Sequence, residues 1–228
     1  MTHPTFDTMP SWLHFDVPSS DPYLRETLFQ FAHCQINPDF EVEKAELDAE
    51  LSSLEMVDRL RSALTADDDE LRVRAAKRLV STFDPDAESI LLRFLNSDYF
   101  FDRMSLAPFG KLFHSDAVVN KVIELATADV DPDVRAEACR GLRGQDLRIA
   151  IPILLRVMHE DGADIDPLSA TTPPDAMAAF VLDELLGTSF MEIRLGNGYS
   201  TFPPGGCQPE ALEKKAKEVL RELQDQVG

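Results

Sequence analysis

The sequence lacks the features that define several classes of protein. It has only three cysteines in 228 residues, at positions 34, 139 and 207. An odd number at such wide spacing forms neither a disulfide framework nor a metal knuckle. No run of about 18 apolar residues is present, as a membrane-spanning helix requires. Pro4, Asp7 and Pro10 stand where a signal peptide needs an apolar stretch. These absences predict a cytoplasmic protein that makes no membrane interaction.

Basic residues are scarce relative to acidic ones. The chain has 22 lysines and arginines against 41 aspartates and glutamates, a formal net charge of −19. Such a charge repels the phosphates of nucleic acids and the surfaces of anionic membranes. We therefore expect no nucleic-acid partner. A protein partner with a basic surface is favoured, and the oligomeric state is left open.

Catalytic and cofactor-binding motifs are also missing. The chain has no phosphate-binding P-loop, no GxSxG nucleophile motif and no dinucleotide fingerprint. His159-Glu160 is a single His-Glu pair, whereas a two-metal site needs several ligands from different helices. The spacing of Asp129, Asp131 and Asp133 is typical of an acidic helix N-terminus. We expect no metal, no cofactor and no enzymatic activity.

Between residues 67 and 159 the sequence repeats itself. Asp68 and Asp131 each open an apolar helical pattern, and an arginine (Arg72, Arg135) follows four residues later. A weaker copy begins at Asp98, so that the three openings are 30 and 33 residues apart. This period is typical of stacked helix pairs. Aspartate at the opening predicts an N-cap.

Each opening helix is followed by a second amphipathic segment. In the clearest of these the apolar residues fall at positions i, i+3, i+4 and i+7, which places them on one face of a helix. They are Ile151, Leu154, Leu155 and Met158. The unit is therefore predicted to be helix, tight turn, helix.

Residues 131–162, DPDVRAEACRGLRGQDLRIAIPILLRVMHEDG, resemble the HEAT-like repeats of phycobilisome lyases. The resemblance implies an all-α fold, a right-handed α-solenoid of stacked antiparallel helix pairs. It also implies that Arg72 and Arg135 bridge to the opening aspartate of a neighbouring repeat. The middle copy has Asp102 at this position, with Arg103 one residue later. The expected repeats lie near 38–64, 68–96, 98–127, 131–159 and 175–226.

The flanking segments complete the expected organisation. Residues 1–19 are predicted to be an irregular arm and 20–228 a single repeat domain. Ser52 and Glu55 have the spacing of a capping box, which places a helix start at Ser52. A helix is expected from about Asp175 to Leu186 and another from Pro209. Between them, residues 190–202 are predicted to form a small β-hairpin insert.

The sequence favours a non-catalytic protein-binding module, of adaptor, chaperone or inhibitor type, that uses the concave face of the solenoid. The candidate partner-binding residues are outward positions on the second helices, with Ile153 and Val157 as apolar neighbours, together with the hairpin tip and two aromatic residues of the insert. They are Arg93, Lys121, Arg148, Arg156, Asn197, Tyr199 and Phe202. The alternative, which rests on the resemblance, is a subunit of a bilin lyase or of another tetrapyrrole-handling enzyme.

Overall fold

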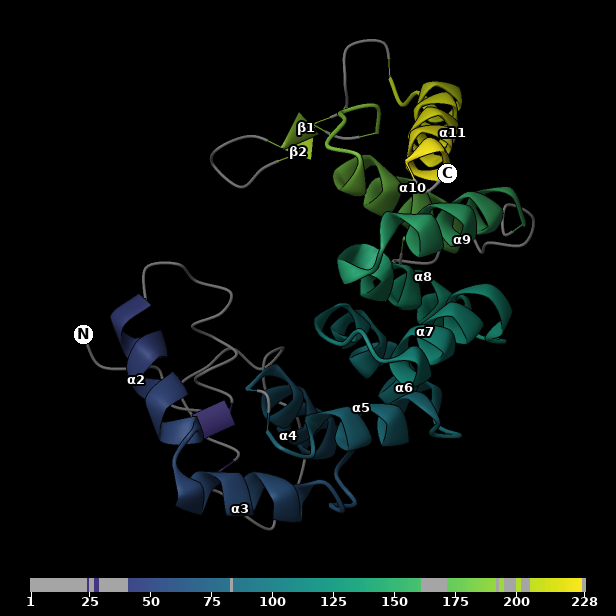
Figure 1. Cartoon of the computed structure of the whole chain (residues 1–228). Coiled ribbons are helices and arrows are strands. Elements are labelled where there is room, and N and C mark those ends of the chain that lie inside the picture. The colour runs from purple at the N-terminus through teal and green to yellow at the C-terminus, as the bar shows by residue number, and fades with distance from the viewer. Residues whose placement is uncertain are drawn as a thin grey trace. The chain divides into compact units, whose positions relative to one another are not determined.

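A computed structural model of the chain describes residues 24, 27–28, 41–82, 84–160, 172–191, 193–194, 200–201 and 206–226. Helices that pack on helices make up nearly all of this part of the chain (Figure 1). The expected all-α class is thus confirmed for the described residues. The chain divides into two compact units, residues 1–91 and 92–228. The expected arm at 1–19 lies outside the described residues.

The first unit contains α2 (Glu41–Leu51), α3 (Leu54–Ala63), α4 (Asp69–Ser81) and the start of α5 (Ala87–Leu95). Helix α3 packs against α2 and α4. The predicted N-cap at Asp68 is confirmed, because its carboxylate accepts a hydrogen bond of 3.0 Å from the Leu71 N–H. The N-cap of α3 is Ser53, which accepts from the Met56 N–H. The prediction of Ser52 was wrong by one residue, since the Ser52 hydroxyl instead donates to the Asp48 carbonyl.

Helix α4 is held to its neighbours by a buried arginine. The Arg78 guanidinium donates to the Asp48 carbonyl at 3.0 Å and to the Ser52 hydroxyl at 3.1 Å, and it forms an ion pair with the Asp48 carboxylate. On α3, Arg61 contacts both carboxylate oxygens of Asp84, at 2.9 and 3.1 Å. These bonds help to fix the positions of α2, α3 and α4 relative to one another, because hydrophobic packing alone does not determine how the helices are aligned.

The second unit is built from two sets of helices. The first set is α6 (Phe100–Leu106), extended by the 3-10 turn η4 (Ala107–Leu112), then α8 (Pro132–Gly141), extended by η5 (Leu142–Gly144), and α10 (Pro174–Leu185). The second set is α7 (Asp116–Ala128), α9 (Leu147–Glu160) and α11 (Pro209–Asp225). Helix α8 packs against α6, α7 and α10, while α9 packs against α7, α10 and α11.

The starts of these helices test the predicted register of the repeats. Asp131 caps α8 as predicted, and its carboxylate accepts from the N–H groups of Asp133 and Val134. The N-cap of α6 is Tyr99, which makes no side-chain capping bond. The middle copy therefore begins one residue later than the predicted opening at Asp98.

Three glycines, Gly110, Gly141 and Gly144, allow η4 to lie very close to α7, to the end of α8 and to η5. A Cβ atom at Gly144 would lie 2.1 Å from the Lys111 carbonyl oxygen, and one at Gly141 would lie 2.4 Å from that of Ala107. The amide of the buried Gln145 closes the same region by donating to the carbonyls of Gly110 and Phe113. Any side chain larger than hydrogen would push these segments apart.

The C-terminal part of the second unit follows the expected order of elements. Helix α10 agrees closely with the predicted span, and Gly187 follows it with φ +62°, typical of a helix end. Strands β1 (Ile193–Arg194) and β2 (Ser200–Thr201) pair antiparallel. The turn between them lies outside the described residues, so the hairpin insert as a whole stays a prediction. None of the described helices has the length and hydrophobicity that crossing a membrane requires.

Candidate protein-binding site

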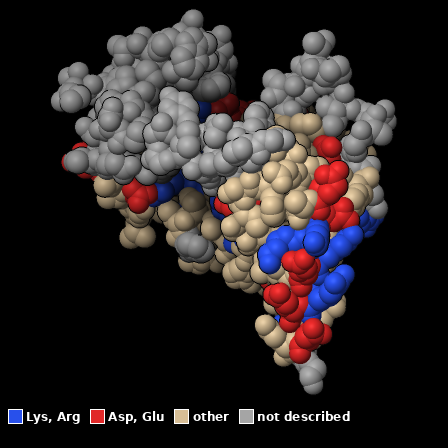
Figure 2. Space-filling view, turned by 90° about the horizontal axis from the view of Figure 1, so that it is seen from above, with Lys and Arg blue, Asp and Glu red and all other residues tan. Residues whose placement is uncertain are grey.

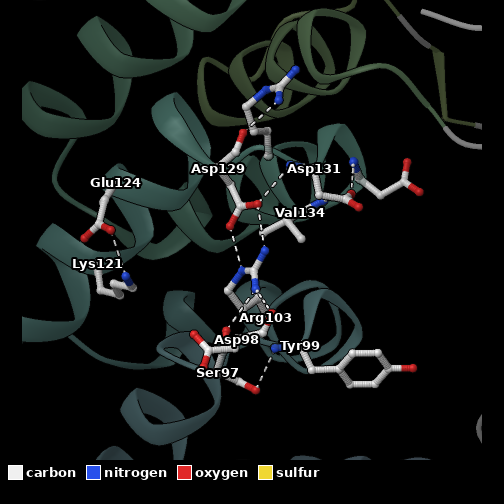
Figure 3. A network of polar contacts seen from close by, with 11 residues as sticks. Ser97, Asp98, Tyr99, Arg103, Lys121, Glu124, Asp129, Asp131 and Val134 are labelled. Atoms are coloured by element: carbon white, nitrogen blue, oxygen red, sulfur yellow. Dashed lines mark hydrogen bonds and ion pairs between the residues drawn. The ribbon is translucent and has the colours of Figure 1, made fainter.

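A buried arginine of the second unit joins the loop before α6 to the loop before α8. Figure 3 shows Arg103 of α6 between the loop at Ser97 and Asp98 and the loop at Asp129. Its Nε and Nη2 atoms donate to the Asp129 carboxylate at 2.7 and 3.0 Å, and Nη1 donates to the carbonyls of Ser97 and Asp98 at 2.9 and 3.0 Å. The side chains of Arg103 and Asp129 are only 12% and 5% exposed. The guanidinium thus has little capacity left to bind a ligand.

The pKa values of Arg103 and Asp129 shift in the directions expected when each charge stabilises the other. Burial alone raises the pKa of Asp129, but the hydrogen bonds from Arg103 and from the Asp131 N–H outweigh burial, so that the pKa lies below its ordinary value. The pKa of Arg103 is raised, chiefly by its hydrogen bond to Asp129. Both groups therefore stay charged at neutral pH, and the two loops are held rigidly together.

The same arginine position recurs in the three copies of the repeat. Arg72, Arg103 and Arg135 each donate to the backbone carbonyl six residues earlier, at 3.1, 2.9 and 2.8 Å. Arg103 is therefore the equivalent of Arg72 and Arg135, and its place one residue late follows from the later start of α6. The bridge to a neighbouring repeat was expected for Arg72 and Arg135. Arg103 of the middle copy makes such a contact, but with Asp129, two residues before the opening Asp131. Arg72 forms an ion pair with Asp69 of its own helix.

Beside this network the surface is hollowed. The hollow has a volume of about 420 Å³ and is lined by residues 95–98, Arg103, Asp129, Val130 and the side of α7 that carries Lys121 and Glu124. Lys121 forms an ion pair of 2.8 Å with Glu124, seen beside the network in Figure 3. Val130 is 90% exposed at its rim. Of the four expected partner-binding residues that the structure describes, Lys121 is the one that lines this hollow.

Two more of the expected residues, Arg148 and Arg156, are exposed on α9. The predicted orientation of that helix was partly wrong. Its buried face consists of Ala150, Ile151, Leu154 and Val157, whereas Leu155 and Met158 are only half-buried. Val157, expected as an apolar neighbour of the binding residues, is 2% exposed and belongs to the core. The reason is that α9 is apolar on most sides, so its period alone does not determine which side is buried.

The remaining expected residues are not brought into this site by the described structure. Arg93 is exposed on α5, and its guanidinium carbon lies 5.6 Å from the centre of the Phe94 ring. Asn197, Tyr199 and Phe202 lie outside the described residues, so their role stays a prediction.

Within the described ranges, no group of three or more histidine, cysteine, aspartate or glutamate side chains is arranged to hold a metal ion. The buried polar groups at the site are committed to structural bonds, as Arg103 is. The site also presents exposed side chains of α7 and α9.

Sequence reasoning missed three residues that share the exposed face of α9 with the two arginines: Ile149, Pro152 and His159. A signal for them was available. No aspartate or glutamate occurs from Leu147 to His159, although the chain has 41 acidic residues in all. Comparison of the chain with protein families, with curated proteins and with solved structures finds no match.

Proposed function

We propose that this protein is a non-catalytic protein-binding module, of adaptor, chaperone or inhibitor type, built as a HEAT-like α-solenoid whose second helices form the binding face. Support comes from the packing of the second unit, where α7 lies against α9 and both lie against helices of the first set. Two neighbouring helices of this kind present a continuous face to a partner.

The observation that carries the proposal is the regular exposure of α7 and α9. On α7 the exposed side chains are Asp116 and then, at spacings of three and four residues, Ala117, Asn120, Glu124 and Ala128. On α9 they are Arg148 and then, at the same spacings, Ile149, Pro152, Arg156 and His159. Arginine, which α9 exposes at two positions, is enriched in surfaces that recognise proteins. Figure 2 shows acidic and basic side chains intermingled on part of the surface that is seen from above.

A photo-crosslinking experiment tests the proposal. A photoreactive amino acid is placed in the full-length chain at Asn120 or Ile149, and the protein is irradiated in a lysate of its source cells. Lys214, exposed on α11, provides a matched control position in the same unit. We expect the same protein adduct from positions 120 and 149, and a much weaker one from position 214.

Two outcomes contradict the proposal. Equal adducts from all three positions, or none from Asn120 and Ile149, would show that the α7–α9 face is not the binding site. Turnover or a shifted absorbance spectrum after incubation of the purified protein with a bilin would favour the tetrapyrrole-handling alternative instead.

A further inference from the structure

The two cations that line the hollow beside α7 already have partners. Arg103 binds the Asp129 carboxylate and two backbone carbonyls, and its side chain is 12% exposed. Lys121 pairs with Glu124, and its side chain is 17% exposed. An anionic ligand would have to break one of these pairs, so the hollow is poorly suited to an anion.

Asp98 is placed differently. It lines the hollow from the loop before α6 and is exposed, across from Lys121 and Glu124 of α7 (Figure 3). Its backbone carbonyl accepts a hydrogen bond from Arg103. Its carboxylate receives no hydrogen bond and no ion pair from the part of the chain that the structure describes. Helix α6 is capped at Tyr99, so Asp98 does not serve as a cap either.

The charge around the hollow is negative. The charged residues that line it are three acids and two cations: Asp98, Glu124, Asp129, Arg103 and Lys121. Outside the described ranges the sequence contains a single lysine or arginine, Arg25. The residues that the structure does not describe therefore add far more acid than base to the chain. Both observations favour a cationic occupant.

The hollow also has an apolar part. Leu95 and Leu125 line it and are buried, while Ala128 and Val130 are exposed, Val130 to 90%. A long side chain that combines an apolar stem with a charged end can use both parts at once.

We propose that this hollow receives an arginine side chain of a partner protein, with its guanidinium on the Asp98 carboxylate and its methylene groups against Val130. The inference rests on the proposed function and names the chemistry of the partner. Arginine fits because its planar guanidinium binds a carboxylate through two hydrogen bonds. It also agrees with the basic partner surface that the net charge of −19 favours.

The hollow adjoins the proposed binding face and has a fixed wall. Glu124 belongs both to the exposed face of α7 and to the lining of the hollow. On the other side, Arg103 holds the loop before α6 to the loop before α8. Because these loops are already in place, binding needs little ordering of the protein and loses less conformational entropy.

An NMR titration of the full-length, ¹⁵N-labelled protein tests the inference, because chemical shifts report binding even at millimolar affinity. The probe is a nine-residue peptide with Leu-Arg-Leu at its centre and glycine and serine on both sides. The matched control peptide has citrulline, which is close to arginine in shape but carries no charge. We expect the arginine peptide to shift the amide signals of Ser97, Tyr99 and Val130 and to bind at least fivefold more tightly than the citrulline peptide.

Protein variants locate the contact. Asp98→Asn should abolish the difference between the two peptides, whereas Asp98→Glu, which keeps the carboxylate, should retain it. Asp225→Asn is the matched control, because it makes the same change at an exposed residue of α11 and should leave the difference within twofold. Val130→Ser should weaken both peptides and leave the preference for arginine. Thermal unfolding of every variant checks that the fold is intact.

The inference is overturned if the citrulline peptide binds as tightly as the arginine peptide, or if Asp98→Asn and Asp225→Asn have equal effects. It is also overturned if no amide signal of the hollow shifts. Failure of the peptide test with retained crosslinks at Asn120 and Ile149 would refute the arginine site and leave the binding face in place. Loss of both would refute the proposed function as well.

Discussion

Arg103 and Asp129 form a two-point ion pair between α6 and the loop that precedes α8, with contacts of 2.7 and 3.0 Å. Because the same guanidinium also donates to the carbonyls of Ser97 and Asp98, one side chain joins two loops. The loops form one wall of the hollow beside α7. The shape of the candidate site thus depends on a contact between residues 26 positions apart.

Removal of one member of this pair should be strongly destabilising. Arg103→Ala leaves a buried carboxylate at Asp129 without its counter-ion, and we expect a loss of about 3 kcal/mol or more in the free energy of unfolding. Lys121→Ala, which breaks the more exposed pair with Glu124, should cost less than about 1 kcal/mol. Urea denaturation of both variants gives the two values. Equal losses would show that the Arg103 pair is no stronger than a surface contact.

The contribution of Asp129 should depend on pH. Its pKa in the folded protein lies below the ordinary value of 3.8. The stabilisation is therefore complete above that value and is lost as the pH falls through the folded pKa. Wild type should be more stable than Asp129→Asn at pH 7, and the gap should narrow below about pH 4. Denaturation curves of both proteins at pH 7, 5 and 3 test this, and a gap that widens in acid would contradict it.

Two neighbouring leucines on α9 should differ in their effects. Leu154 is fully buried, so Leu154→Ala should cost about 2–5 kcal/mol. Leu155 is half-buried and borders the exposed face, so Leu155→Ala should cost less than half as much. The sequence pattern alone placed both in the core. Chemical denaturation measures the loss in the free energy of unfolding for each variant. Equal losses would favour the orientation of α9 predicted from the sequence.

Two glycines should resist substitution for different reasons. Alanine at Gly144 would place a Cβ atom against the Lys111 backbone, and overpacking of this kind costs about 1–3 kcal/mol. At Gly187 no atom lies within 4 Å, but φ is +62°, and alanine there should cost about 1–2 kcal/mol through backbone strain. Asparagine, which tolerates positive φ, should recover stability at position 187 and not at 144. Thermal unfolding of the four variants tests this difference.

Features that depend on a few neighbouring residues could be predicted from the sequence. The N-caps at Asp68 and Asp131 follow from a carboxylate beside the first turn of an apolar helix, and the structure confirms both. The start of α11 at Pro209 follows in the same way from a residue that suits the first helical turn. Such signals are local, because the groups that interact lie within one turn of each other.

The later start of α6 could not be predicted in this way. Asp98 has the residue type of an N-cap, yet the helix is capped at Tyr99, where Arg103 reaches both the Ser97 carbonyl and the Asp129 carboxylate. A shift of the helix start by one residue costs little free energy locally. The long-range bond between Arg103 and Asp129 is therefore enough to determine where α6 begins.

The sequence by itself determined the helical class of the described residues and the caps that begin several helices, because helical periodicity and capping are properties of short segments. The tertiary structure alone decided which side of α9 is buried. That helix is apolar on most sides, so its buried side is the one that packs against α7, α10 and α11. It also decided the local charge of the candidate site. Net charge sums over the whole chain, whereas a partner meets the side chains that packing leaves exposed, which here include Arg148 and Arg156 of α9 and Glu124 of α7.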